Sequence, residues 1–169
     1  MTIAHRDGPV TAQRAGDSRS RAAVAADAAA RFFAAYRRHD IEAMAEMCTD
    51  TAEFSYVPYE VWGKQRVLRG DGMVGTVGKT IWTGLINSFP DLFNEVHDID
   101  ANDAGDVLVR CDIGGTQQLA WGFAEPCGGA FREPHLFILR VDEDGRIGSV
   151  RAYWDGAGIN RRLGHLEVD

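Results

Sequence analysis

The stretch that decides the fold runs from Phe131 to Asp155 and reads FREPHLFILRVDEDGRIGSVRAYWD. Acidic residues followed by glycine separate its two apolar runs at 142–145, a pattern typical of a β-hairpin turn. Successive side chains of a strand point to opposite faces. One face of the first run therefore carries Glu133, His135, Phe137, Leu139 and Val141. We expect two antiparallel strands that place a Glu-x-His pair among large apolar groups.

The second run of this hairpin and the segment before it follow the same alternation. Trp154 shares a face with Val150 and Ala152. Residues 92–99 and 107–118 are predicted strands joined by a polar turn at 100–105. In the second of these strands one face carries Val107, Val109, Cys111 and Ile113. Residues 119–130 contain glycines and Pro126, and predict a loop or an irregular strand.

The first half of the chain predicts helices. Residues 20–38 are rich in alanine and predict a helix, which Ser18 or Ser20 can cap. Apolar residues recur there at helical spacing, at Val24, Ala28, Phe32 and Tyr36. Asp40 is suited to capping a second, short helix. A third helix is expected at about 80–88.

The remaining segments connect these elements. Residues 52–56 predict a strand, and the glycine-rich residues 63–78 predict a long loop. Residues 156–163 predict a tail with one helical turn, which Asp155 would cap unless it pairs with Arg151 or Arg161. Helices followed by a meandering sheet indicate an α+β fold in which the sheet curls around the helices and leaves a pocket.

Composition limits the classes of function. The chain has 169 residues and a net charge of −7, which argues against nucleic acid or an anionic membrane as the main partner. We expect a mobile arm over 1–19, one domain over 20–169 and a cytoplasmic location, because no membrane-spanning run or signal-peptide core is evident. The three cysteines lie far apart and form no C-x-x-C, so neither a zinc site nor a disulfide framework is indicated.

Two glycine motifs and the histidines are the candidate cofactor and metal sites of the sequence. Residues 70–75 match G-x-G-x-x-G, but no β-α-β unit surrounds them. Residues 72–80 differ from a P-loop in having five residues, not four, between the two glycines. Of the histidines, only His135 lies on a predicted apolar face, and a catalytic metal usually needs three convergent ligands. We therefore predict no metal and no cofactor.

Several short motifs together resemble a known family. They are Arg31–Tyr36, Asp40–Met44, Thr49–Ala52, Ser88–Asp91, Asp144–Ile147, Tyr153–Asp155 and Arg162–Gly164. Their order and spacing over residues 20–164 are similar to the SnoaL-like branch of the nuclear-transport-factor-2-like superfamily, which includes polyketide ester cyclases and ketosteroid isomerases. The resemblance implies a cone-shaped half-barrel, a deep apolar pocket and a homodimer formed through the outer face of the sheet. It also implies cofactor-free cyclisation, isomerisation, dehydration or epoxide hydrolysis, although some members only bind a ligand or partner.

The resemblance does not supply the family's catalytic residues. Phe32, Tyr56 and Phe137 stand where ketosteroid isomerases carry a tyrosine, the base and an oxyanion acid. The aspartate of SnoaL cyclases falls at Ala152, and their histidine falls near Phe137. His135 lies two residues earlier on the same face. Steroid isomerisation by the usual mechanism is therefore not expected.

His135 is the best candidate for an acid or base, because histidine titrates near neutrality. Glu133 lies about 7 Å along the strand and can orient the imidazole or act as a base of raised pKa. The competing interpretation is a buried His–Glu hydrogen bond that only holds the sheet together. Tyr56 and Tyr36 can donate to an enolate oxygen or simply pack in the core. The expected apolar wall for a flat substrate consists of Phe32, Phe137, Trp154 and Trp82.

Two hypotheses follow. The first is an enzyme that acts on a small apolar carbonyl compound of polyketide or polycyclic type, with His135, Glu133 and Tyr56 as catalytic residues. The second is a small-molecule-binding or accessory protein with the same fold and no turnover.

Overall fold

The computed structural model describes residues 19–58, 70–122 and 124–165. The expected mobile arm therefore lies outside the described residues except for Arg19, as do residues 63–69 of the expected loop. The described helices are α1 (Arg21–Arg37), α2 (Ile41–Glu46), α3 (Lys79–Ser88) and α4 (Gly156–Arg162), with a π-helical turn, η1 (Val74–Gly78). The described strands are β1 (Cys48–Pro58), β2 (Gly70–Met73), β3 (Phe93–Ala101), β4 (Asp106–Thr116), β5 (Ala130–Val141) and β6 (Ile147–Trp154).

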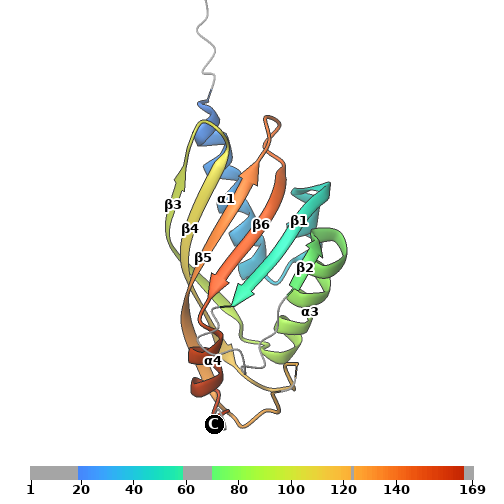
Figure 1. Ribbon diagram of the computed structural model, residues 1–169, viewed down its shortest axis with the longest axis vertical. Helices are drawn as coiled ribbons and strands as arrows, with labels where there is room; N and C mark the ends of the chain where they lie inside the picture. The colour runs from blue at the N-terminus through green and yellow to red at the C-terminus, as the bar shows by residue number, and fades with distance from the viewer. Residues whose placement is uncertain (1–18, 59–69, 123, 166–169) are drawn as a thin grey trace, which may run out of the picture.

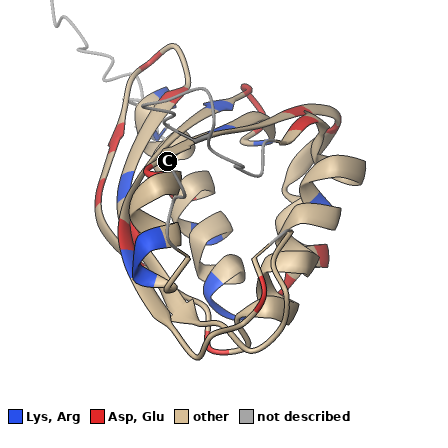
Figure 2. Ribbon diagram, turned by 60° about the horizontal axis from the view of Figure 1, so that its bottom comes forward, with Lys and Arg blue, Asp and Glu red and all other residues tan. Residues whose placement is uncertain are grey.

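These strands form one sheet in the order β2-β1-β6-β5-β4-β3. All neighbours are antiparallel except β1 and β6, which run parallel. The sheet curves around the helices, and α1 lies against its concave face at β3, β4 and β5 (Figure 1). Figure 2 shows this curvature with the end of the molecule that carries α4 turned forward. The predicted α+β fold with a curved mixed sheet is confirmed.

Three side chains begin helices as their sequence positions predict. The hydroxyl of Ser20 accepts a hydrogen bond from the Ala23 N–H at 3.2 Å. The Asp40 carboxylate accepts from the Ala43 N–H at 3.0 Å, and that of Asp155 accepts from the N–H of Gly158 at 2.9 Å. Each side chain provides an acceptor for an amide that has none within its helix.

The hairpin of β5 and β6 forms as predicted. Its turn contains Gly145, whose φ of 77° favours glycine. The Asp142 carboxylate accepts from the amides of Asp144 and Arg146, at 3.0 and 2.8 Å. Burial alternates along β5, so the face that carries Phe137 and its neighbours two residues apart points toward the helices.

The prediction of a loop over 63–78 is wrong for residues 70–78, the part that the structure describes. Residues 70–73 pair with β1, and residues 74–78 form η1, which continues into α3. The glycines serve close packing here: a Cβ on Gly70 would lie 2.0 Å from the Cδ1 of Ile81, and one on Gly72 would lie 2.5 Å from a Val77 methyl. Glycine composition predicted a flexible segment, whereas these glycines allow two elements to approach.

The core between the sheet and the helices is aromatic. The Trp82 ring of α3 makes edge contacts with Phe32 and Phe54, at centroid distances of 5.6 and 5.3 Å. Phe33 contacts Phe137 of β5 in the same way at 5.0 Å. Cys48 and Cys111 are buried. Among the described residues, no helix combines the length and apolarity needed to span a membrane.

The alternation along β5 can be tested with two adjacent residues. Leu139 is fully buried, and the side chain of Arg140 is 74% exposed. Leu139→Ala should lower the free energy of unfolding by about 2–5 kcal/mol because it opens a cavity. Arg140→Ala is the matched control and should lower it by less than about 1 kcal/mol. Urea denaturation measures both, and equal losses would contradict the assigned faces.

Candidate active site

His135 lies on the concave face of the sheet at the centre of three strands. Its partners in register are Cys111 on β4 and Trp154 on β6. The imidazole is parallel to the Trp154 indole within 4°, with centroids 6.1 Å apart, and stacks at 6.2 Å from the Phe137 ring. The residue is partly exposed. The site therefore presents an imidazole between two flat aromatic rings.

One hydrogen bond determines the state of this imidazole. The Nδ1 atom of His135 lies 2.9 Å from the backbone oxygen of Glu133. A carbonyl oxygen can only accept, so Nδ1 carries the proton, and the Nε2 lone pair makes no recorded hydrogen bond with the described residues. Burial lowers the pKa of His135 to about 4, although the Glu133 carbonyl and the Asp112 charge act against the shift. The ring is therefore neutral at pH 7 and can accept a proton at Nε2.

The Glu133 carboxylate is buried but does not contact the imidazole in any recorded hydrogen bond or ion pair. Its Oε2 lies 3.1 Å from the Nε of Arg162 on α4, without the alignment of a hydrogen bond. Burial raises the pKa of Glu133, as does the charge of Asp155, while Arg162 and Arg161 oppose the shift. The backbone of Glu133, rather than the carboxylate that we considered, thus holds the imidazole.

Two buried tyrosines approach the same region from α1 and β1. The Tyr56 hydroxyl accepts from the Nε1–H of Trp82 at 2.7 Å. The Tyr36 hydroxyl is buried and makes no well-formed hydrogen bond with the described residues. Burial raises the pKa of both phenols, and the neighbouring Tyr56 raises that of Tyr36 further. Both phenols are neutral at pH 7, and at least one phenolic proton lacks an acceptor.

The expected aromatic wall divides into two parts. Phe137 and Trp154 flank the imidazole, and the Phe137 ring also lies 6.2 Å from that of Tyr56. Phe32 and Trp82 pack within the aromatic core, with Trp82 6.5 Å from the Tyr36 ring. The structure therefore brings His135, Phe137 and Trp154 together, with the tyrosines beside them and Phe32 and Trp82 behind.

Sequence reasoning missed two neighbours of this site. Cys111 lies close enough to both tyrosines to influence their pKa values, and burial raises the pKa of its own thiol to about 12, so it is not a thiolate at pH 7. Trp121 lies between β4 and β5, with its ring 5.8 Å from that of Trp154. No local pattern indicates that the segment 119–130 turns this indole toward β6.

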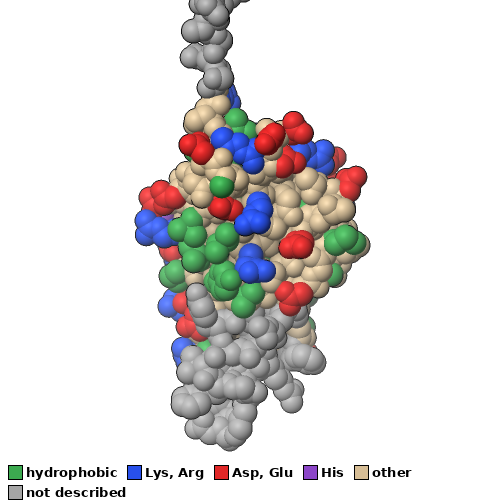
Figure 3. All heavy atoms as spheres, turned by 45° about the horizontal axis from the view of Figure 1, so that its top comes forward, with side chains coloured by type: hydrophobic (Ala, Val, Ile, Leu, Met, Phe, Trp, Pro, Cys, Tyr) green, Lys and Arg blue, Asp and Glu red, His purple; other side chains and the backbone are tan. Residues whose placement is uncertain are grey.

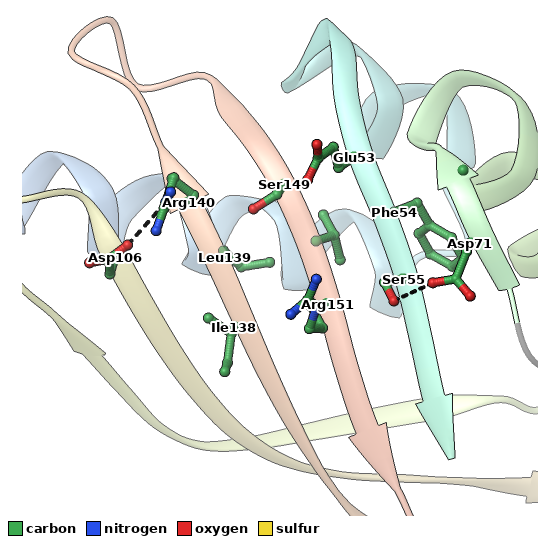
Figure 4. A pocket seen from close by; sticks show the side chains of 12 residues that line it. Glu53, Phe54, Ser55, Asp71, Asp106, Ile138, Leu139, Arg140, Ser149 and Arg151 are labelled. Atoms are coloured by element: carbon green, nitrogen blue, oxygen red, sulfur yellow. Dashed lines mark hydrogen bonds and ion pairs between the residues drawn. The ribbon is translucent and has the colours of Figure 1, made fainter.

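A depression of about 510 Å³ lies on the other face of the sheet (Figure 4). Its lining includes Glu53 and Arg151, and its charges are largely paired: Ser55 donates to Asp71 at 2.6 Å, and Arg140 lies 3.2 Å from Asp106. These side chains point away from the helices, so this is not the apolar pocket that we predicted inside the cone. In the described segments no group of three or more His, Cys, Asp or Glu side chains could hold a metal ion.

The comparisons with known proteins can now be set beside this geometry. A family model described as SnoaL-like domain matches residues 29–150. The chain belongs to the SnoaL-like family. The predicted resemblance is thus confirmed, and membership is consistent with an enzyme that needs no cofactor. No curated protein matches this SnoaL-like chain in sequence.

Three solved structures share the fold. AclR from Streptomyces galilaeus, provisionally described as a hydroxylase, is 20% identical over 87% of this chain and 89% of its own, with a TM-score of 0.68. IdmH from Streptomyces antibioticus, provisionally described as a polyketide cyclase, is 24% identical over 83% and 98%, with a TM-score of 0.64. SalBIII, an epoxide hydrolase/cyclase-like enzyme in pyran ring formation in salinomycin, is 18% identical over 80% and 93%, with a TM-score of 0.60. At such identities the similarity establishes the fold and not the reaction.

The lowered pKa of His135 predicts a pH dependence of stability. The ordinary pKa of about 6.5 applies to the unfolded chain, so between pH 6.5 and 4 the unfolded state binds more protons than the folded state. The free energy of unfolding should therefore decrease as the pH falls through this window, by no more than about 3 kcal/mol from this residue. His135→Gln should lose that component in denaturation curves measured at several pH values.

The exposed His97 provides a control for this experiment, since His97→Gln keeps the imidazole at position 135. The control should retain the wild-type dependence. A His135→Gln variant with the same pH dependence as the wild type would contradict the buried, neutral imidazole.

Proposed function

We propose that this SnoaL-like protein is a cofactor-independent enzyme that moves a proton on a small apolar carbonyl compound, with His135 as the general base. The observation that carries the proposal is the neutral imidazole whose Nε2 lone pair is free, because Nδ1 is committed to the Glu133 carbonyl. Its position between aromatic rings suits a flat substrate.

The proposed chemistry begins with removal of a proton from the carbon beside the substrate carbonyl. Nε2 takes that proton, and negative charge develops on the carbonyl oxygen. A phenolic O–H of Tyr36 or Tyr56 donates a hydrogen bond to this oxygen, which stabilises it most when its charge is greatest. The enolate in turn favours the protonated imidazole by charge. Return of the proton to another carbon completes an isomerisation. In a cyclisation the enolate carbon instead attacks a second carbonyl carbon of the substrate, and the proton goes to the alkoxide that forms. In a dehydration the proton goes to a β-hydroxyl group, whose C–O bond breaks so that it leaves as water.

In this proposal Glu133 positions the imidazole of His135. Its carbonyl fixes the tautomer and the orientation of His135, and its carboxylate pairs with Arg162. Phe137 and Trp154 would sandwich the substrate, and Phe32 and Trp82 would support them from the core. The names of IdmH and SalBIII favour cyclisation among the possible reactions and polyketide-type compounds among the substrates.

A second candidate function is ligand binding without turnover. It is favoured by one observation: the described structure records no carboxylate contact with the imidazole, because that of Glu133 pairs with Arg162. It also agrees with the apolar residues at the family's catalytic positions, such as Phe32 and Ala152.

Exchange of the C1 protons of 2-tetralone in D₂O, followed by NMR, separates the two functions. The wild type should accelerate exchange, and His135→Ala should lower the rate by about 10²–10⁴-fold, the usual contribution of a general base. Binding of 2-tetralone, measured by calorimetry, should persist in the variant. The exchange rate should also fall as the pH drops through about 4, where His135 becomes protonated.

Arg140→Ala is the control, since Arg140 lies on the same strand as His135 but its side chain is 74% exposed on the opposite side of the sheet. It should exchange at the wild-type rate. Binding of 2-tetralone without accelerated exchange by the wild type would favour the binding protein. Accelerated exchange that His135→Ala leaves unchanged would contradict His135 as the general base.

We further propose a homodimer formed through the convex face of the sheet. Four apolar side chains from adjacent strands form a convex patch there: Leu108, Leu136, Ile138 and Tyr153. Leu108 and Ile138 are opposite in register and are 37% and 39% exposed. Figure 3 shows hydrophobic side chains gathered beside charged ones of both signs on this face. An apolar centre with a charged border is typical of a protein interface.

The dimer can be tested by sedimentation velocity. Ile138→Glu places a charge at the centre of the convex patch and should convert the dimer to a monomer. Leu119→Glu is the matched control because Leu119 is also exposed, at 58%, but lies outside the patch. A wild-type monomer at micromolar concentration, or dissociation by both variants alike, would contradict the interface.

A further inference from the structure

Two neighbouring indole N–H groups, one on the tryptophan that stacks on His135, have no hydrogen-bond partner among the described residues. Trp154 ends β6 and is 4% exposed. Trp121 faces it from the segment between β4 and β5, with ring centroids 5.8 Å apart. The Nε1 atoms of both are buried, and neither has a hydrogen-bond partner among the described residues. Native proteins leave few buried donors unpaired.

The segment that carries Trp121 is fixed by several hydrogen bonds. The unpaired indole N–H of Trp121 is therefore not explained by a poorly held segment. Trp121 and Ala124 exchange two backbone hydrogen bonds, of 2.9 and 3.0 Å. The Gln117 side chain, which is 1% exposed, donates to the backbone oxygens of Ala124 and Leu119 at 2.7 and 3.2 Å. Ser88 donates to the Ala120 oxygen at 2.9 Å. The indole also packs against Phe89 at 5.8 Å.

The energetics indicate what the two donors are for. A buried donor without an acceptor destabilises the fold, whereas an apolar ring of similar shape avoids that cost. Packing alone would therefore be served better by phenylalanine at either position. We infer that Trp121 and Trp154 together bind an acceptor oxygen of the ligand. This inference rests on the ligand binding at His135 that the proposed function requires, but not on the proton transfer.

The charges near the two indoles indicate which kind of ligand oxygen they can bind. Within the described residues neither indole is in a recorded cation contact, and the charged groups at this end of β5 and β6 are already engaged: Glu133 pairs with Arg162, and Asp155 caps α4. Burying an ionised ligand group beside two neutral donors is costly. The paired indoles therefore suit a neutral oxygen, such as that of a ketone, an ether or a hydroxyl. Because Trp154 stacks on His135, this oxygen lies on the part of the ligand nearest the imidazole.

Acetophenone and α-methylstyrene test the inference, because they have the same shape and differ by a carbonyl oxygen in place of a methylene. In ¹⁵N–¹H spectra of the wild type, acetophenone should move the indole N–H signals of Trp121 and Trp154 downfield beyond the shift caused by α-methylstyrene. Trp121→Phe and Trp154→Phe assign the signals. Each should weaken acetophenone binding about fivefold, the worth of one neutral hydrogen bond, and leave α-methylstyrene binding unchanged.

Arg140→Ala is again the control and should bind both probes as the wild type does. Acetophenone binding that leaves both indole signals unmoved, or that survives both Phe variants unweakened, would overturn the paired donors and leave the general base of the proposed function intact. The expected indole shifts together with unchanged exchange in His135→Ala would instead remove the proton transfer and retain the oxygen site. Failure of both probes to bind at millimolar concentration would overturn the pocket itself.

Discussion

Strand β5 is hydrogen-bonded on both sides, to β4 and to β6, and the faces of the sheet depend on this double pairing. A shift of one residue would exchange every inward side chain for an outward one. His135 and Phe137 would then face solvent, and Leu136 and Ile138 would enter the core. The register is secured at the turn by Asp142 and Gly145 and along the strand by fully buried residues such as Leu139.

This pairing also gives the concave and convex faces of the sheet different chemical environments. On the concave side four ionisable groups are neutral at pH 7: an imidazole of lowered pKa, two phenols and a thiol of raised pKa. On the convex side the charges are exposed and paired, as in the contacts of Arg132 with Asp112 and Glu95. Proton transfer and molecular association can therefore use opposite faces without competing for the same residues.

Much of this arrangement could be predicted because it depends on backbone periodicity. The alternation along 131–141 places Glu133 and His135 on one face whatever their later contacts, and Ser20, Asp40 and Asp155 are local helix caps. The family resemblance of residues 20–164 added the curvature of the sheet. Contacts between the ends of side chains could not be predicted from the sequence. The Glu133 carboxylate pairs with Arg162 on α4, and the segment that carries Trp121 is held by hydrogen bonds from Gln117 and Ser88. The loop predicted around Gly70 and Gly72 was wrong because glycine content alone does not distinguish a flexible segment from one that packs closely.

The parallel contact between β1 and β6 joins the two halves of the chain, since the other strand pairs are antiparallel and lie within one half. During synthesis β1 leaves the ribosome long before its neighbour exists, so its edge stays open until the last strand is made. Contacts so distant in sequence form slowly because a long loop must close first. The final strand thus completes the sheet and, through Trp154, also completes the surroundings of the imidazole.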